Sequence, residues 1–101
     1  MSNIRRPAVA GMFYPGGAAA LQAMVDEFMA QTPQPAAAAP KAVIVPHAGL
    51  VYSGPVAATA YAQLAPAREE IRRIVLLGPS HRLPFQGLAL SSAERFSTPL
   101  G

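Results

Sequence analysis

The sequence contains no cysteine and no tryptophan, and charged residues make up only 13% of its 101 positions. Without cysteine the chain can form no disulfide and offers no thiolate to a metal ion. It has no apolar run of membrane-spanning length, and residues 1–7 lack the apolar core of a signal peptide. These absences argue against disulfide-rich and membrane-spanning proteins and predict a soluble, cytoplasmic one.

Basic residues are scattered along the chain rather than clustered. Eight Lys and Arg against five Asp and Glu give a formal net charge of +3. Nucleic-acid-binding surfaces usually show a basic run or stripe interleaved with aromatic residues, and this sequence has neither. We therefore expect no nucleic-acid partner. Hydrophobic residues, at 51%, suffice for the core of one domain or part of one.

A first helix is predicted over residues 21–29. Its apolar residues recur at the spacing of one helical face: Leu21, Met24, Val25, Phe28 and Met29. We expect this face to pack on a sheet. The segment that follows, residues 32–40, is rich in proline and alanine and predicts an exposed connector.

One pattern occurs twice: a short apolar run rich in β-branched residues, a turn that contains proline, and a histidine. Residues 42–45 lead to His47, and residues 74–77 lead to His81. Each run suits a strand buried in a parallel sheet, and residues 87–90 are a weaker third candidate. The predicted fold class is α/β, with a βαβ unit in a parallel or mixed sheet flanked by helices.

A second, alanine-rich helix is predicted between these two strands, over residues 56–64. Ser53 or Gly54 would cap it, and Pro55 would occupy its first position, where a missing N–H costs nothing. Pro66 would end it.

His47 and His81 are the only histidines of the chain. At the carboxyl ends of neighbouring parallel strands they would face one crevice, where open α/β sheets bind ligands. Imidazole is both a common metal ligand and a common acid–base group. Non-haem iron often takes two histidines and a carboxylate, but none of the five acidic residues is an obvious third ligand. The alternative is that both histidines are turn residues hydrogen-bonded to the backbone.

Three further residues are candidates for the edge of a pocket: Tyr52, Ser53 and Ser80. Ser80 beside His81 suggests a nucleophile with its base, yet a triad also needs an orienting carboxylate and an oxyanion hole. We expect Ser80 to shape the turn. Ser53 lies at the predicted helix start, where backbone donors could meet an anion or where the hydroxyl could simply cap the helix.

Five motifs together resemble the Memo family in order and spacing. They are Arg6-Pro7-Ala8-Val9-Ala10-Gly11-Met12-Phe13-Tyr14-Pro15, Pro46-His47-Ala48-Gly49, Tyr52-Ser53-Gly54, Leu77-Gly78-Pro79-Ser80-His81 and Ser97-Thr98-Pro99-Leu100-Gly101. This family includes the bacterial proteins called AmmeMemoRadiSam system protein B. The resemblance implies a fold similar to class III extradiol dioxygenases, with His47 and His81 matching two histidines of a metal-site cleft that would hold iron or copper. It also implies a functional association with a radical SAM protein.

The sequence departs from the family pattern in two ways. Leu50 stands where the family often has tyrosine, which removes one phenol from the edge of the pocket. Family members are also much longer, and a further histidine, an aspartate and in many members a cysteine of the site follow the equivalent of Gly101. We therefore expect residues 1–101 to be the amino-terminal part of a single Memo-like α/β domain.

Two functions are compatible with this resemblance. The first is a metal-dependent redox activity, similar to that of a non-haem-iron dioxygenase, with metal on His47 and His81. The second is a binding module without chemistry, an adaptor that receives a peptide or a small anion in the same cleft. In either case an incomplete sheet would expose a strand edge, so association of chains is expected.

Overall fold

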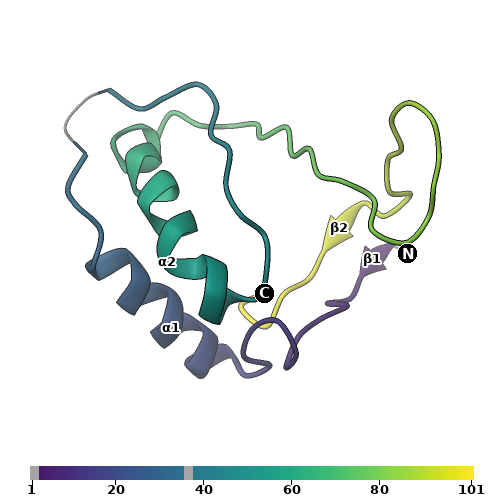
Figure 1. Cartoon of the computed structure of the whole chain (residues 1–101), viewed down its shortest axis with the longest axis horizontal. Coiled ribbons are helices and arrows are strands. Elements are labelled where there is room, and N and C mark those ends of the chain that lie inside the picture. Colours follow the sequence, from purple (N-terminus) through teal and green to yellow (C-terminus); the bar gives the residue numbers. More distant parts are fainter. Residues whose placement is uncertain (1–2, 36–37) are drawn as a thin grey trace.

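The structure is a computed structural model that describes residues 3–35 and 38–101. Its elements are the strand β1 (Ile4–Arg5), the helices α1 (Ala18–Ala30) and α2 (Leu50–Tyr61), the 3-10 helix η1 (Ala62–Ala67) and the strand β2 (Arg95–Phe96). The two α-helices lie side by side, and long irregular segments connect them to the short parallel sheet (Figure 1). This arrangement confirms an α/β fold in its coarse form.

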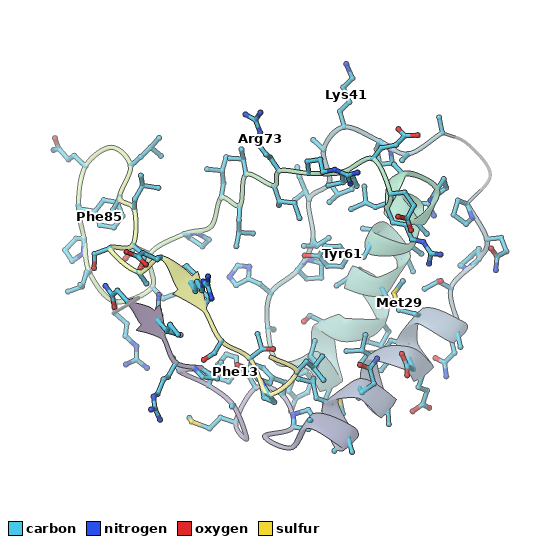
Figure 2. The ribbon with its side chains drawn as sticks, turned by 180° about the vertical axis from the view of Figure 1, so that it is seen from behind. Phe13, Met29, Lys41, Tyr61, Arg73 and Phe85 are labelled. Atoms are coloured by element: carbon cyan, nitrogen blue, oxygen red, sulfur yellow. The ribbon has the colours of Figure 1, made fainter. Side chains whose placement is uncertain are left out.

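Helix α1 forms where the apolar periodicity predicts it, but its partner differs from the prediction. Its apolar face packs against α2 rather than on a sheet. Between the two helices lies an open apolar groove, to which Met29 contributes from α1 and Tyr61 from α2 (Figure 2). The connector that follows α1 has no helix or strand in residues 32–35 and 38–40, and its residues 36 and 37 lie outside the described residues.

Helix α2 begins before the predicted start. The Gly49 carbonyl accepts hydrogen bonds from the Tyr52 and Ser53 amides at 2.9 and 3.0 Å, so the first turn is complete ahead of Pro55. Pro55 therefore lies inside the helix, where it forgoes one helical hydrogen bond, and the predicted cap at Ser53 or Gly54 is wrong. Pro66 does not end the α-helix either, since α2 ends at Tyr61 and Pro66 lies within η1.

The buried part of the described chain is small and sits along α2. Its members, apart from Leu21 of α1, have short side chains: Ser53, Gly54, Ala57, Ala58 and Ala62. Short side chains let the two helices approach closely. At Gly54 the helices lie so close together that a Cβ built there would overlap the ring of Phe28.

Gly54→Ala is expected to lower the free energy of unfolding by about 1 kcal/mol, because overpacking against Phe28 outweighs the better helix propensity of alanine. Urea unfolding followed by circular dichroism measures this change. The matched control is Gly54→Ala in a Phe28→Ala background, where the overlap is gone and the substitution should be neutral or stabilising. If the single variant is as stable as the parent, the Phe28 ring moves freely into the groove, and its close packing on Gly54 contributes nothing to the free energy of unfolding.

The short sheet joins the two ends of the described chain. β1 and β2 pair in parallel, with Ile4 opposite Arg95 and Arg5 opposite Phe96. The Asn3 side chain donates to the Ser92 carbonyl at 3.1 Å, and the Arg5 guanidinium lies 5.8 Å from the centre of the Phe96 ring. Such a cation–π contact at an exposed site adds roughly 0.5–1 kcal/mol.

The predicted strands at residues 42–45, 74–77 and 87–90 are wrong for the described chain. All three segments lack strand structure, and residues 42–45 and 74–77 make no backbone hydrogen bonds within the described residues. Ile44 is fully exposed, and Leu76 is 86% exposed. A β-branched run favours an extended backbone, but a strand also needs hydrogen bonds to a neighbouring strand, and none of the three segments pairs in this way among the described residues. Residues 3–35 and 38–101 therefore contain no βαβ unit.

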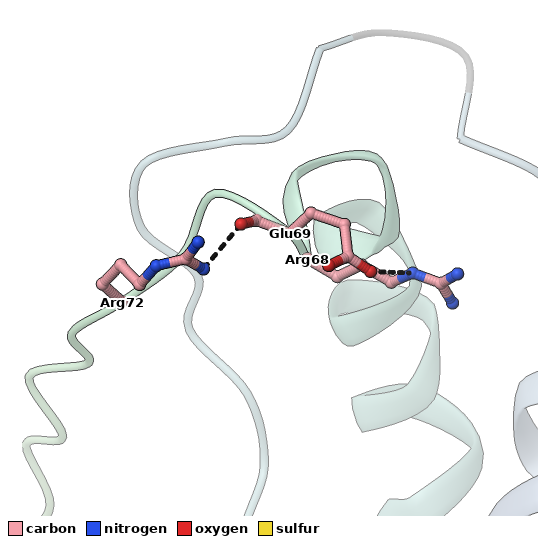
Figure 3. Close-up of polar contacts among 3 residues, drawn as sticks. All are labelled: Arg68, Glu69 and Arg72. Carbon is pink, nitrogen blue, oxygen red and sulfur yellow. Dashed lines mark hydrogen bonds and ion pairs between the residues drawn. The ribbon is translucent and has the colours of Figure 1, made fainter.

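A charged segment leads from η1 toward residues 74–77. The Arg72 guanidinium donates to the Glu69 carbonyl at 2.6 Å, and the Arg68 Nε atom lies 3.5 Å from the Glu69 carboxylate (Figure 3). Both side chains of the ion pair are at least 80% exposed, so the pair adds little stability. Lys41 and Arg73 project outward from the two extended segments (Figure 2). Among the described residues, no helix is both long and apolar enough to cross a membrane.

Candidate functional site

The two histidines meet, although the strands that were expected to bring them together are absent. The Nε2 atoms of His47 and His81 lie 3.0 Å apart. The ring centroids are separated by 5.2 Å, and the ring planes are inclined by 45°. Both side chains are exposed, so a ligand can reach them from solvent.

The backbone after His47 is fixed by hydrogen bonds from two directions. The Leu50 amide, at the start of α2, donates to the Phe13 carbonyl at 2.8 Å. The Ser53 hydroxyl donates to the Ala48 carbonyl at 2.7 Å. One bond ties the turn to the amino-terminal segment and the other ties it to the helix, so His47 stands on a turn with two anchors.

His81 is carried by a tight turn that Ser80 organises. The Ser80 hydroxyl donates to the Leu83 carbonyl at 2.6 Å and accepts from the Leu83 amide at 3.3 Å. Ser80 thus shapes the turn, as predicted. Its hydroxyl is engaged within the turn rather than directed into a cleft. Tyr52, another predicted pocket residue, is 83% exposed.

Two ring nitrogens 3.0 Å apart can interact in two ways. In the absence of metal, one ring with a proton on Nε2 can donate a hydrogen bond to the bare Nε2 of the other. Alternatively, both nitrogens are bare and bind one cation. The two arrangements exclude each other, because a metal ion displaces the shared proton.

The nitrogen separation fits a single shared ion. Metal–imidazole bonds are about 2.0–2.1 Å long, so two nitrogens 3.0 Å apart can both reach one ion at roughly a right angle. That angle suits neighbouring ligands of an octahedral or square-planar ion, such as iron or copper, better than ligands of tetrahedral zinc.

No third protein ligand joins the histidines within residues 3–35 and 38–101, where no group of three His, Cys, Asp or Glu could hold a metal. Two acidic side chains have other partners: Asp26 accepts from Gln22 at 2.8 Å, and Glu69 pairs with Arg68. The described site therefore offers two ligands and leaves the remaining coordination positions to other groups.

The groove between α1 and α2 was not anticipated from the sequence. Its wall is entirely apolar and includes Val25, Phe28 and Leu50. The periodicity of residues 21–29 did identify the face of α1 that lines it. What the sequence could not indicate was that α2 supplies the second wall, because the apolar spacing within one helix does not say what that helix packs against.

The sequence of this chain is similar to one family along nearly its whole length. The sequence profile of Memo-like proteins matches residues 5–101. The chain is 41% identical to Protein MEMO1 of Danio rerio over 103 residues, covering 99% of the chain and 34% of that relative. It is 37% identical to a MEMO1 family protein of Aquifex aeolicus over 99 residues, covering 98% of the chain and 35% of that relative. The chain thus spans about a third of the length of these relatives, and no solved structure matches it.

Proposed function

Because this chain belongs to the Memo family, we propose that it binds one redox-active metal ion, iron or copper, through His47 and His81. The proposed role is a metal-dependent redox activity, similar to that of non-haem-iron dioxygenases of the extradiol type. The observation that carries the proposal is the 3.0 Å separation of the two Nε2 atoms, which come from turns 34 residues apart in the sequence.

The surroundings of the two rings support this proposal. Both rings are exposed, so incoming metal can reach the nitrogens without unfolding the chain. With two protein ligands, an octahedral or square-planar ion keeps positions for an external ligand. When bound, the ion would supply a Lewis-acidic and redox-active centre. His47 and His81 would hold it, each on its own backbone turn.

Metal titration of the 101-residue chain tests the proposal. Copper(II), added to the metal-free protein and followed by electron paramagnetic resonance, is expected to bind weakly with a 1:1 stoichiometry and to show hyperfine coupling to imidazole nitrogen. Binding should be weak because two ligands leave the site incomplete. Added azide should change the spectrum, since open positions accept an external ligand.

A variant that lacks both histidines, His47→Ala with His81→Ala, is the control. Copper binding to the parent that is no stronger than to this variant would rule out the proposed site. The chain would then fit the second function, a binding module whose histidines share a hydrogen bond. A peptide or small anion that binds equally well with a chelator present would support that function.

A further inference from the structure

The Ser53 hydroxyl donates a hydrogen bond to the Ala48 carbonyl, which lies outside α2. The Ser53 side chain is buried, with 6% of the residue exposed, and its hydroxyl lies 2.7 Å from the Ala48 carbonyl oxygen. The Gly49 carbonyl is farther from this hydroxyl, at 3.3 Å, and already accepts the Ser53 amide at 3.0 Å. The hydroxyl therefore adds a connection to the backbone outside the helix, at the residue next to His47.

The position of this hydroxyl is fixed by helix packing. Gly54, the next residue, lies against the Phe28 ring of α1 so closely that no side chain fits between them. Helix α2 thus cannot turn about its axis or slide without breaking that contact. A hydroxyl on a helix held in this way defines the position of the Ala48 carbonyl.

We propose that Ser53 is a positioning residue, which holds the turn at Ala48 so that the His47 ring stays within reach of His81. This role differs from lining a pocket, since the hydroxyl acts through the backbone rather than on a ligand. The inference rests on the proposed metal function only for its effect on metal binding. The geometry of the two rings is measurable without metal.

Ser53→Ala tests the proposal in the metal-free chain. With ring centroids 5.2 Å apart, the parent is expected to show a nuclear Overhauser effect between ring protons of His47 and His81. Ser53→Ala should abolish this effect, because the Ala48 carbonyl loses its side-chain donor. Copper(II) affinity should fall about tenfold, as is typical when a group that orients a ligand is removed.

Thr59→Ala is the matched control on the same helix. The Thr59 hydroxyl also donates to a carbonyl, that of Val56 at 2.6 Å, but it lies on the exposed side and has no link to the histidine turns. This variant should keep both the ring contact and the copper affinity. If Ser53→Ala keeps them too, with the same helical circular dichroism as Thr59→Ala, the positioning role is refuted.

A second variant decides the matter if Ser53→Ala loses helical content. Ser53→Cys keeps nearly the volume of serine but carries a much weaker donor, and it is assessed by the ring contact alone because a thiol can bind copper. Loss of the ring contact with the helix intact supports the proposal, and a retained contact overturns it. If the parent shows the ring contact but binds no copper, the metal function fails while the positioning role is still decided by these variants.

Discussion

Replacing His47 with alanine is expected to lower the metal affinity of the chain by at least roughly 100-fold, because the change removes one of two protein ligands. The fold should remain. His47 is exposed, and a surface substitution of this kind usually changes the free energy of unfolding by less than about 0.5 kcal/mol. Bound iron or copper and thermal unfolding should be measured on the same samples.

His81→Ala provides the matched comparison. If both rings share one ion, either single variant should lose about as much affinity as the double variant, because the two ligands act as a unit. Equal metal content in His47→Ala and the parent would remove His47 from the site. Collapse of the fold in His47→Ala would instead favour the alternative that His47 is a structural turn residue.

The second large effect concerns association between chains. Residues 74–77 expose apolar side chains, and their backbone amides and carbonyls have no hydrogen-bond partner within the described residues. Such an unpaired edge can pair with another chain. We expect the 101-residue chain to associate with rising concentration. Leu76→Lys should weaken that association about tenfold or more, since burial of one leucine contributes ~1.5–3 kcal/mol.

Sedimentation velocity over a range of concentrations measures this association. Val51→Lys is the control, because Val51 is also exposed, at 70%, but lies on α2, where no strand can pair. This variant should associate as the parent does. A parent chain that sediments as a monomer at every concentration would contradict the prediction, and so would equal effects of the two lysine substitutions.

The elements that could be predicted from the sequence are those set by neighbouring residues. The spacing of apolar residues in 21–29 specified α1 because a helix forms from contacts within one segment. Pro55 does not mark the start of α2, because hydrogen bonds from the Tyr52 and Ser53 amides to the Gly49 carbonyl complete a turn before the proline is reached. A proline costs one bond, and the rest of the helix can outweigh that loss.

The predicted strands at residues 42–45, 74–77 and 87–90 did not form, for a different reason. The run at 74–77 has the composition of a buried strand, but a strand is completed by backbone from elsewhere, and composition does not say where that backbone lies. The strands that do form, at Ile4–Arg5 and Arg95–Phe96, carry no such pattern. The sequence did indicate that His47 and His81 meet, since each histidine follows the end of an apolar run. The two turns bring the rings together although no sheet joins the runs.

The parallel pairing of β1 with β2 also bears on the order in which the chain folds. Asn3 and Ser92, which meet beside this pairing, are 89 residues apart in the sequence. Closing a loop of that length costs about 4 kcal/mol of chain entropy, whereas the turns of α1 and α2 close over a few residues. The hydrogen bonds of a two-residue parallel ladder offset little of that entropy cost. The helices can therefore form early, and the junction of the two ends belongs to the last and most easily reversed step of folding.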